Sequence, residues 1–401
     1  MLTLDAIYKA KTTLQHTIRR TPISPAQGIN PTCNLYLKAE NLQLTGSFKV
    51  RGSAYKMSQL TEEEKAKGVI ACSAGNHAQG VALAAQQFGV KSVICLPSGA
   101  PVSKVEATRE YGAKICMVQG VYDDAYAEAL RQQKEHDLTF IHPFDDEAVI
   151  AGQGTVGLEI MEDLPEVEVL LVPIGGGGLA AGVALAVKSL NPNVKVYGVQ
   201  AEGAPSMQRS LEAHEICQLA RVNTVADGIA VKRPGIHTFA LCEQYLDGIV
   251  TVSEDEICAA ILALIERPKL IAEGAGAVAV AAAMYNKVPL QGKTVCAIVS
   301  GGNIDVTILN RVITRGLLKS YRITDMLIEM ADHPGSLLDL TQVIMDHGAN
   351  IISVHHERSG ENREVTSCNL RVTLETRNQA QIKAIQRDIT ASGYTIIETK
   401  N

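Results

Sequence analysis

The amino-acid sequence predicts an α/β fold built on two parallel β-sheets, followed by a smaller domain that combines strands and helices in another order. Three observations point to this architecture. From residue 69 onward, short apolar runs alternate with helical stretches, the runs consist mostly of Val, Ile and Leu, and the alternation stops near residue 320. Strand–helix units of ~20–25 residues indicate right-handed crossovers between parallel strands. Nearly continuous apolar strands are typical of sheets that are covered on both faces.

The first sheet is expected between about residues 50 and 145, which form the predicted small subdomain. Its strands are predicted at 69–73 (VIACS), 91–97 (KSVICLP), 113–118 (AKICMV) and 138–143 (LTFIHP). Helices are predicted between these strands, in an Ala-rich stretch from Asn76 and over 101–112 and 122–136.

The second sheet is expected in a large subdomain formed by residues 1–49 and 146–320. Its apolar strands are predicted at 167–174 (VEVLLVPI), at 194–202 (VKVYGVQAE) and within 293–303 (KTVCAIVSGGN). A helix is predicted from residue 179, soon after the first of these strands. The two subdomains together make residues 1–320 the predicted main domain.

After residue 320 the sequence predicts a separate domain, residues 321–401. Strands are predicted at 325–331, 350–359, 363–376 and 394–399, with a turn at 360–362 and helices at 336–348 and 378–393. The order β-α-β-β-α-β is the ferredoxin-like arrangement. In the third strand, apolar and polar residues alternate, which predicts one buried and one solvated face. The apolar positions are Cys368, Leu370, Val372 and Leu374, and the polar ones are Asn369, Arg371, Thr373 and Glu375.

The overall composition excludes several classes of function. The chain has 401 residues and a formal net charge of −6, without a run of Lys or Arg, so no nucleic-acid partner is expected. No apolar stretch approaches the ~18 residues needed to span a bilayer, so no membrane partner is expected. The nine cysteines are scattered without a C-x-x-C pair, which indicates buried thiols in a reducing cytoplasm rather than disulfides or a metal site.

The stretch LTGSFKVRG (44–52) contains the first candidate reactive residue. Lys49 lies between Phe48 and Val50, after a flexible Thr-Gly-Ser turn. A lysine with such neighbours is either a surface charge or an amine held in a reactive, uncharged form. The flanking residues alone leave both interpretations open.

A run of four glycines in PIGGGGLAAG (173–182) follows a predicted buried strand and opens a predicted helix. Glycines expose backbone N–H groups, and the helix dipole adds partial positive charge, so this turn is suited to a phosphate group. The spacing Gly175-x-Gly177-x-x-Ala180, with Glu202 after the next strand, also satisfies a dinucleotide-binding pattern. A third interpretation is a tight packing turn without a ligand.

Two further strand-end turns carry polar groups. In CSAGNHAQG (72–80), the backbone amides of residues 73–77 can face an anion such as a carboxylate. His77 taken alone is more typical of a packed or capping histidine than of a catalytic base.

In VSGGNID (299–305), Ser300 follows a predicted central strand, at the edge where open α/β sheets bind ligands. A serine there is usually just a turn hydroxyl.

Taken together and in this order, TGSFKVRG, SAGNHAQG, GGGGLAAG and SGGN strongly resemble the motifs of pyridoxal-phosphate enzymes of the tryptophan-synthase-like type (fold type II). Within that type, the sequence is most similar to the threonine ammonia-lyases. The resemblance covers residues 1 to about 320, and residues 321–401 resemble an ACT regulatory domain with DHPGSLLDL as its strand–turn–helix motif. Hydride transfer on a dinucleotide would need neither Lys49 nor Ser300, so the resemblance favours pyridoxal phosphate as the cofactor.

The resemblance implies a role for each motif. Lys49 would form a Schiff base with the cofactor aldehyde, and Phe48 would lie against the pyridine ring. Asn76 would bind the ring hydroxyl, and Ser300 would meet the ring nitrogen. The phosphate would be held by Gly175, Gly176, Gly177, Gly178 and Leu179, and the substrate carboxylate by Ser73, Ala74, Gly75 and His77.

The chemistry of these residue types agrees with the implied roles. A lysine that forms a Schiff base must be neutral to attack, and desolvation can lower a lysine pKa by up to ~3–5 units. A neutral serine at the ring nitrogen makes the ring a weaker electron sink than an acidic partner would. Loss of a β-leaving group is then favoured over transamination.

The implied reaction is dehydration and deamination of L-threonine to 2-oxobutanoate and ammonia, with Lys49 removing the Cα proton, and of L-serine to pyruvate. Alternatives are an L-serine dehydratase or serine racemase-like enzyme, a β-replacement enzyme of the cysteine synthase type, and an inactive amino-acid sensor. Ala74 stands where the related racemases carry a proton-donating serine, so racemisation is disfavoured. Gln200 and Ser206 align with two metal-binding carboxylates of those racemases, so no metal ion is expected.

The C-terminal domain has two interpretations. It is either a dimerisation module whose exposed sheet edges pair between subunits, or a regulatory site for an amino acid such as isoleucine or valine. The effector would bind near Gly335 and the turn at 348–352. We expect a homo-oligomer, a dimer or a tetramer, in the cytoplasm.

Overall fold

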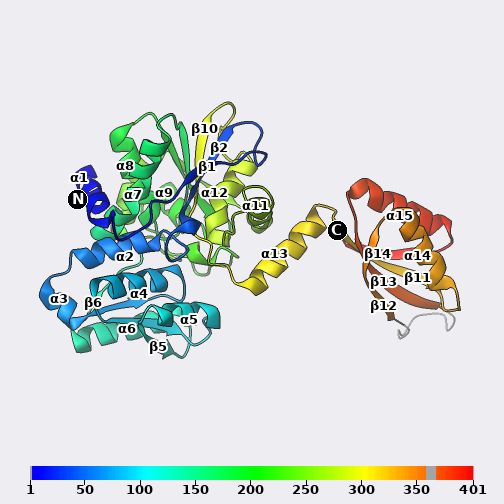
Figure 1. The fold of residues 1–401 in the computed structure, drawn as a ribbon, viewed down its shortest axis with the longest axis horizontal. Coiled ribbons are helices and arrows are strands. Elements are labelled where there is room, and N and C mark those ends of the chain that lie inside the picture. Colours follow the sequence, from blue (N-terminus) through cyan, green and yellow to red (C-terminus); the bar gives the residue numbers. More distant parts are fainter. Residues whose placement is uncertain (1, 358–366, 401) are drawn as a thin grey trace. The chain divides into compact units, whose positions relative to one another are not determined.

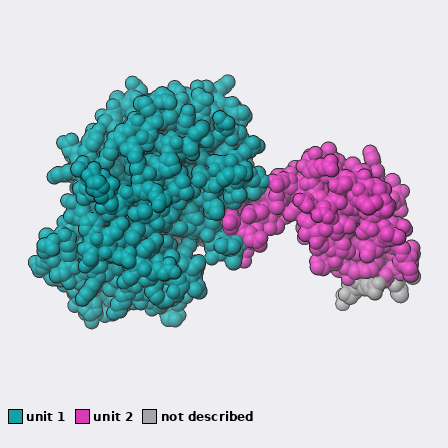
Figure 2. Space-filling view, in the orientation of Figure 1, with its two compact units in different colours: residues 1–308 teal, residues 309–401 magenta. Residues whose placement is uncertain are grey.

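The computed structural model describes residues 2–357 and 367–400. The chain divides into two compact units, residues 1–308 and residues 309–401, which Figure 2 shows in different colours. Helix α13, Val306–Lys319, begins in the first unit and continues into the second. Each unit has its own sheets and its own hydrophobic core, so the boundary separates two differently built parts of the chain.

The larger sheet of the first unit has six strands in the order β1-β2-β10-β7-β8-β9. Neighbouring strands run parallel except β1, which pairs antiparallel with β2. The strands are β1 Ile23–Pro25, β2 Asn34–Ala39, β7 Val169–Pro173, β8 Lys195–Ala201, β9 Gly248–Val252 and β10 Thr294–Val299. The helices that belong to this part are α1 Leu4–Leu14, α7 Glu147–Asp163, α8 Gly178–Leu190, α9 Ser206–Ala213, α10 Ile236–Tyr245, α11 Glu254–Glu266 and α12 Gly274–Met284. Strand β7 is buried along its whole length, as expected for the centre of a sheet with helices on both faces.

The smaller sheet has four parallel strands in the order β5-β4-β3-β6. They are β3 Val69–Cys72, β4 Ser92–Pro97, β5 Lys114–Val118 and β6 Thr139–Phe140. Figure 1 shows these strands together with the helices α2 Lys49–Ser58, α3 Glu62–Lys67, α4 Asn76–Phe88, α5 Val102–Glu110 and α6 Tyr122–His136. One hydrophobic core includes Ile94 of β4 as well as Val172 of β7. The two sheets are therefore joined by a shared core within the first unit.

The second unit contains a four-stranded antiparallel sheet in the order β12-β13-β11-β14. Its elements follow one another as β11 Ile323–Ala331, α14 Ser336–Asp346, β12 Asn350–Glu357, β13 Ser367–Glu375, α15 Gln379–Ala391 and β14 Thr395–Lys400. Alternate residues of β11 are buried, among them Met326 and Ile328. They belong to a separate core with Leu340 of α14 and Ile385 of α15, so the two helices cover one face of the sheet.

The predicted fold class is confirmed, with parallel α/β sheets in the first unit and the β-α-β-β-α-β order in the second. The predicted turn at 360–362 and the first residues of the strand at 363–376 lie outside the described residues. One detail of the strand pattern is wrong: Asn369 is only 3% exposed, because β13 is a central strand and Glu329 and Glu357 flank this position. None of the nine cysteines, which all lie among the described residues, forms a disulfide, and Cys33, Cys116 and Cys217 are only partly buried. Among the described residues, no helix combines the length and apolar character that crossing a membrane requires.

Candidate active site

A cavity of about 780 Å³ lies in the first unit, beside the carboxyl ends of β3, β7 and β10. Every site residue predicted from the sequence lines this cavity. These residues come from four segments: the start of α2 and the turns after the three strands. Parallel strands bring their carboxyl ends to one edge of a sheet, which is how distant glycine-rich turns meet.

Ser300, after β10, lies directly against the segment that carries the candidate lysine. The backbone amide of Phe48 donates to the Ser300 carbonyl oxygen at 3.1 Å, and the amide of Gly302 donates to the carbonyl oxygen of Gly46 at 2.8 Å. The Ser300 hydroxyl donates to the carbonyl oxygen of Ala275 at 3.1 Å. One hydroxyl proton serves one acceptor, so hydrogen bonding from Ser300 to a ligand nitrogen would require it to turn away from Ala275.

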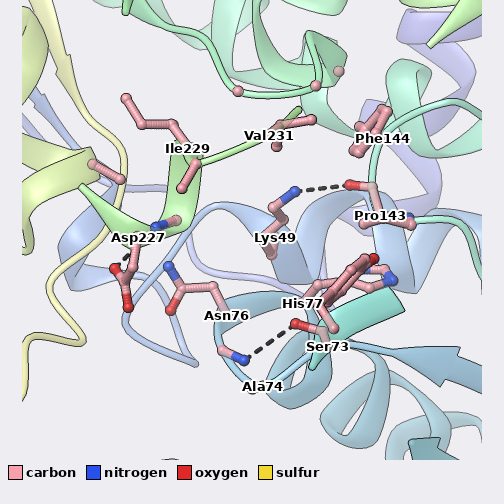
Figure 3. A pocket seen from close by; sticks show the side chains of 18 of the residues that line it. Lys49, Ser73, Ala74, Asn76, His77, Pro143, Phe144, Asp227, Ile229 and Val231 are labelled. Carbon is pink, nitrogen blue, oxygen red and sulfur yellow. Dashed lines mark hydrogen bonds between the residues drawn. The ribbon is translucent and has the colours of Figure 1, made fainter. Parts of the chain in front are cut away.

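Lys49 is the first residue of α2, and its half-buried side chain borders the cavity (Figure 3). Its Nζ donates to the carbonyl oxygen of Pro143 at 2.7 Å and lies 5.2 Å from the centre of the Phe48 ring. Burial lowers the pKa of Lys49 to about 8, against a smaller opposing effect of the Glu273 carboxylate. About a tenth of the amine is then uncharged at pH 7, compared with less than about a thousandth at an ordinary lysine pKa. The structure thus places a reactive amine at the cavity wall.

Next to Lys49, the same helix is anchored by a buried group of charges. Arg51 donates from Nε to Glu40 at 2.8 Å and from Nη1 to Glu159 at 2.7 Å, and Lys38 Nζ donates to Glu159 at 2.6 Å. These four side chains are at most 7% exposed. Burial acts to lower the pKa of Arg51, but the two carboxylates raise it above its usual value. Two cations face two anions, so the cluster supports α2 without a net charge.

The four-glycine turn after β7 forms a close-fitting cradle in the cavity wall. Gly177 precedes α8 with a φ of +101°, a conformation that residues with a Cβ rarely adopt. A Cβ on Gly176 would lie 2.4 Å from the ring of Phe144, so only glycine fits there. Among the described residues, no oxygen accepts a hydrogen bond from the backbone amides of Gly175–Leu179. Such amides at a helix N-terminus are suited to a phosphate dianion.

The turn after β3 presents a second set of backbone amides, at the start of α4. Within the described part of the chain, no acceptor pairs with the amides of Ala74, Asn76 and His77. The amide of Gly75 donates instead to the Ser73 hydroxyl at 3.1 Å (Figure 3). This smaller group of amides is suited to a carboxylate.

His77 is packed rather than poised for proton transfer. It is 3% exposed, and its Nε2 lies 2.8 Å from the carbonyl oxygen of Ile141. A carbonyl oxygen only accepts, so Nε2 carries a proton. Burial, followed by the nearby charge of Lys49, lowers the pKa of His77 to about 3. The residue is therefore neutral at pH 7, and its position alone already favoured a packed histidine over a base.

Asn76 is held by two side chains that the sequence analysis did not single out. Its Nδ2 donates to Glu273 at 2.5 Å, and its Oδ1 accepts from Asn303 Nδ2 at 2.8 Å. Asn303 also donates to the carbonyl oxygen of Thr45 at 2.7 Å. Asn303 thus connects the turn after β10 with the segment before Lys49 and the turn after β3. Its only sequence signal is its place in the SGGN motif.

Glu273 lies at the N-terminal cap of α12 and is 3% exposed. Burial, followed by the negative charge of Asp227, raises the pKa of Glu273 to about 7, while Lys104 opposes the shift. Lys104 Nζ in turn lies 2.7 Å from the Asp227 carboxylate. The glycine-rich helix start AEGAGAV (272–278) is the one sequence signal for Glu273, and it does not distinguish a site residue from a packing turn.

The segment after β6 supplies a further wall that the motifs did not indicate. His142, Pro143 and Phe144 line the cavity. Nδ1 of His142 accepts from the backbone amides of Phe144 at 3.2 Å and Asp145 at 2.7 Å. Burial is the largest cause that lowers the pKa of His142 to about 4. The ring is neutral and fixes the loop that carries the Lys49 acceptor.

Gln200 and Ser206, the two positions that the sequence resemblance compared with a metal site, are both buried. The Gln200 side chain donates to the carbonyl oxygens of Ile174 and Ala204 at 3.3 Å each. Its own carbonyl oxygen accepts from the backbone amide of Gln208 at 2.8 Å. Backbone groups thus engage both ends of the amide, so Gln200 fixes the turn after β8.

The arrangement fits pyridoxal phosphate on two structural grounds. The Lys49 amine, with its lowered pKa, can react with an aldehyde. The amides of Gly175–Leu179 have no protein acceptor among the described residues and can hold a phosphate, and any larger residue at Gly176 would collide with the Phe144 ring that also lines the cavity. The amides of Ala74, Asn76 and His77 then remain for the carboxylate of an amino acid.

The chain is similar to known proteins along nearly its whole length. Residues 14–301 match the family described as "Pyridoxal-phosphate dependent enzyme", and residues 324–390 match the family described as "ACT domain". The chain is 48% identical over 398 residues to an L-threonine ammonia-lyase of Thermotoga maritima, with 99% of each chain covered. It is 45% identical over 313 residues to a catabolic L-threonine dehydratase of Escherichia coli, which covers 77% of this chain and 95% of that one.

Solved structures share the fold. The processed form of threonine deaminase isoform 2 from Solanum lycopersicum has a TM-score of 0.73 and 38% identity, covering 78% of this chain and 89% of that chain. Maize serine racemase has a TM-score of 0.74 and 34% identity, covering 79% of this chain and 98% of that chain. The same fold is therefore found in proteins named for two different reactions.

Proposed function

The chain belongs to the pyridoxal-phosphate-dependent enzymes and carries a C-terminal ACT domain, and on that premise we propose that it deaminates L-threonine to 2-oxobutanoate and ammonia. L-Serine, which lacks one methyl group, is the expected second substrate and yields pyruvate and ammonia. The observation that carries this proposal is Lys49, an amine with a pKa of about 8 that borders the cavity. The similarity to relatives named L-threonine ammonia-lyase, over 99% of the chain, supports threonine as the main substrate.

We assign the cofactor to the amine and the glycine cradle together. Lys49 Nζ would bond to the aldehyde carbon, and the amides of Gly175–Leu179 would hold the phosphate. Phe48 would lie against the ring, Asn76 would bind the ring hydroxyl, and Ser300 would meet the ring nitrogen. When bound, pyridoxal phosphate supplies an aldehyde that links to amino groups and a conjugated ring that draws electrons from the substrate Cα.

The turn after β3 would bind the substrate. The amides of Ala74, Asn76 and His77 would hold the carboxylate without a cationic side chain. Ser73 and Gly75 complete the turn, and their mutual hydrogen bond keeps its shape. A carboxylate held there would orient the amino acid within the cavity that Lys49 borders.

Lys49 would also move the proton that the reaction requires. Once the substrate amino group had replaced Lys49 on the aldehyde carbon, the freed, neutral Nζ would accept the proton from the substrate Cα, and a pKa of about 8 lies close to the working pH of a general base. The substrate then loses its β-hydroxyl, and the Cα proton and hydroxyl together leave as water. Later addition of one water and loss of ammonia gives 2-oxobutanoate, so the atoms of L-threonine equal those of the two products.

Racemisation is the second candidate, because maize serine racemase has the same fold at a TM-score of 0.74. Inversion at Cα needs a second proton donor on the face opposite Lys49. Ala74, which lines the cavity where related racemases carry a serine, offers only a methyl group. We therefore expect elimination to be faster than inversion.

Product analysis tests the proposal. Purified enzyme is incubated with L-threonine or L-serine, and keto acids, D-serine and any sulfide-dependent product are measured. We expect 2-oxobutanoate from L-threonine and pyruvate from L-serine, with both lost in Lys49→Ala. D-Serine as the main product would favour a racemase, and a sulfide-dependent product would favour β-replacement. Absence of turnover with both substrates would contradict the proposal.

We also propose that an amino acid such as isoleucine or valine regulates the enzyme by binding near Gly335 and residues 348–352, around the start of β12. The match of residues 324–390 to the ACT family supports this assignment. A Cβ added to Gly335 would meet no atom within 4 Å, so a ligand can approach the start of α14 from that side. Kinetics with added amino acids test the idea, with a chain lacking residues 321–401 as the control. Unchanged kinetics with every amino acid would contradict it.

Oligomeric state, domain limits and location complete the proposal. We propose a homo-oligomer, a dimer or tetramer, because β12 and β14 are edge strands that can pair between subunits, and light scattering measures its mass. We propose a catalytic domain of residues 1–320, with a small subdomain at about 50–145, and a regulatory domain of residues 321–401. The nine cysteines, all among the described residues and none in a disulfide, support a reducing cytoplasm.

A further inference from the structure

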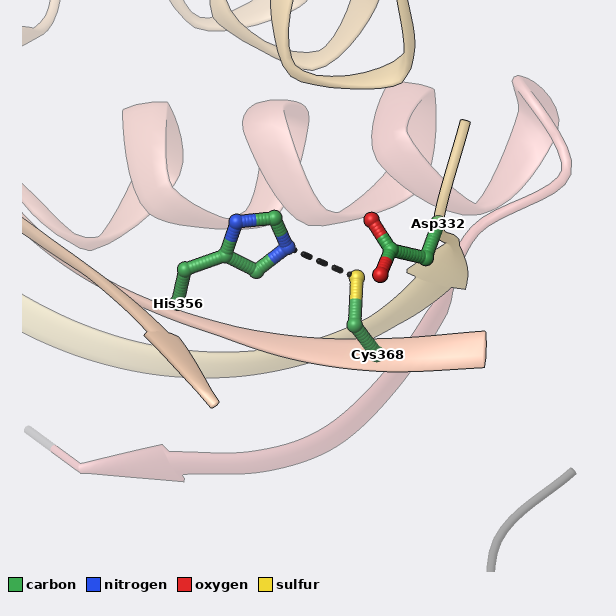
Figure 4. Close-up of side chains that lie close together, drawn as sticks. All are labelled: Asp332, His356 and Cys368. Carbon is green, nitrogen blue, oxygen red and sulfur yellow. Dashed lines mark hydrogen bonds between the residues drawn. The ribbon is translucent and has the colours of Figure 1, made fainter. Parts of the chain in front are cut away.

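Three side chains of the second unit converge although the proposed catalysis does not use them. Asp332 follows β11, His356 lies in β12 and Cys368 lies in β13. Nε2 of His356 is 2.9 Å from Sγ of Cys368, and the candidate ligand atoms of the three residues lie within 4.8 Å of one another. Figure 4 shows the three groups directed toward one another. Among the described residues, no other group of three His, Cys, Asp or Glu side chains comes this close together.

The strand register explains why these side chains meet. Met330 pairs with Cys368, and His356 pairs with Leu370. Paired residues share a face of the sheet, and so do residues two apart along one strand. Cys368 and His356 therefore lie on one face, and Asp332 extends from the same side of β11. The backbone hydrogen bonds between the paired strands therefore fix where these three residues lie.

We propose that Asp332, His356 and Cys368 bind a divalent cation of the zinc type, with water as the fourth ligand. Thiolate, imidazole and carboxylate are the ligands that zinc takes in tetrahedral sites. Bond lengths of about 2.0–2.3 Å place neighbouring ligand atoms about 3.5 Å apart. The 2.9 Å contact between His356 and Cys368 and the upper limit of 4.8 Å lie on either side of that spacing. Small side-chain rotations would therefore complete the site.

The exposure of the three residues suits a cation that enters from solvent. Cys368 is fully buried, whereas Asp332 and His356 are exposed. The buried thiolate would form the inner ligand, and the imidazole and carboxylate would close the site from the solvent side.

Mixed sulfur, nitrogen and oxygen ligands favour zinc over magnesium or calcium, which take oxygen ligands. Binding would displace the thiol proton, so the affinity should rise with pH.

The simpler alternative is a hydrogen bond between His356 and Cys368 beside a surface carboxylate. It accounts for the 2.9 Å contact. It does not account for the convergence of a third ligand type from another strand end. The two interpretations differ in one measurable property, the affinity of the protein for Zn²⁺.

The test uses tag-free, full-length holoenzyme that has been freed of metal ions under reducing conditions. Calorimetric titration with Zn²⁺ and metal analysis after equilibrium dialysis give affinity and stoichiometry. We expect one Zn²⁺ per chain at micromolar affinity or tighter. His356→Gln and Cys368→Ser should each weaken binding by at least about tenfold, and Asp332→Asn should weaken it in the same direction.

Two variants serve as controls for binding elsewhere. His355→Gln changes the neighbouring residue of β12, which alternation places on the opposite face. Cys217→Ser removes a partly exposed thiol of the first unit. Both should bind Zn²⁺ like the wild type.

Lack of a one-to-one Zn²⁺ complex in the wild type would overturn the proposal. Equal affinities of His356→Gln and the wild type would overturn it as well, because the ion would then lie elsewhere. If the buried change Cys368→Ser prevents folding, the variants at the two exposed positions still decide. The readout is metal binding rather than turnover, so its outcome is independent of the proposed deaminase activity.

Discussion

Lys49 and Arg51 are two cations of one helix, two residues apart, in opposite electrostatic environments. Arg51 is buried against the carboxylates of Glu40 and Glu159, which raise its pKa above the usual value despite burial. Lys49 has a carbonyl oxygen and an aromatic ring as its nearest partners, and burial lowers its pKa to about 8. Burial acts to lower the pKa of both groups, so the nearby counter-charges explain why the two pKa values shift in opposite directions.

This difference separates a structural charge from a reactive one. Two carboxylates fix the guanidinium in place and keep it charged, which anchors α2. Glu273 is the counter-charge that acts on Lys49, and it is itself partly protonated near neutral pH, since its pKa is about 7. The helix thus holds an amine in a fixed position without holding its proton tightly.

Replacing Lys49 with Ala removes the reactive amine and should have the largest effect on activity. We expect keto-acid production from L-threonine to fall by at least about 10³-fold, since the amine both bonds the cofactor and moves the Cα proton. The free energy of unfolding should stay equal or rise, because the lost group is a desolvated cation. Steady-state kinetics and urea unfolding check both expectations. Activity within about tenfold of the wild type would contradict them.

Replacing Arg51 with Met removes the buried charge that anchors α2. The substitution leaves Glu40 and Glu159 buried without their main partner, so the free energy of unfolding should fall by ~3–5 kcal/mol. Urea denaturation measures the change. The control is Arg131→Met, because Arg131 pairs with Glu128 and Glu135 at a side-chain exposure of 60%, and its loss should alter stability little. Similar losses in both variants would show that the buried cluster has no special role.

A change in the glycine cradle tests whether the amine depends on the opposite wall to capture the cofactor. In Gly176→Ala, the new methyl group would lie 2.4 Å from the Phe144 ring. Overpacking of this kind costs ~1–3 kcal/mol, so pyridoxal-phosphate affinity should fall about tenfold or more. The control is Gly99→Ala, where a Cβ meets no atom within 4 Å. Absorbance titration of cofactor-free protein compares the two, and equal affinities would exclude a cradle at Gly176.

Glu273→Gln should have the smallest effect and concerns the partial counter-charge of Lys49. The pKa of Glu273 is raised from 4.5 to about 7 in the folded protein. The contribution of Glu273 to the free energy of unfolding is therefore full below pH 4.5, and it is lost as the pH rises to about 7. The stability of the wild type relative to the variant should fall across that range and stay level above it. Urea unfolding at several pH values checks this, and a difference independent of pH would contradict it.

The sequence predicted the fold and the four motif segments because these features leave local patterns. Apolar strands followed by glycine-rich turns indicated candidate ligand-binding turns, and the resemblance to a known family assigned these turns to one site. Glu273 and Asn303 escaped prediction because their partner, Asn76, is 197 and 227 residues away along the chain. Likewise, the pairing of Arg51 with Glu159 spans 108 residues. A residue whose role depends on a distant partner carries no local signal.

The same reason applies to the second unit. The alternating pattern identifies Cys368 only as a core-facing thiol, and the structure confirms that it is buried. His356 and Asp332 reach it from separate strands of the sheet. Their convergence depends on the register of two strand pairs, which the local sequence does not specify.

The central claim is that burial with little counter-charge keeps part of the Lys49 amine neutral at pH 7. The most direct test is the rate at which cofactor-free enzyme takes up pyridoxal phosphate, followed by absorbance from about pH 6 to about pH 10. Only the neutral amine attacks an aldehyde, so the rate should rise with pH and reach half of its maximum near pH 8. A half-maximum near the ordinary lysine pKa of ~10.4, or an unchanged rate in Lys49→Ala, would contradict the claim.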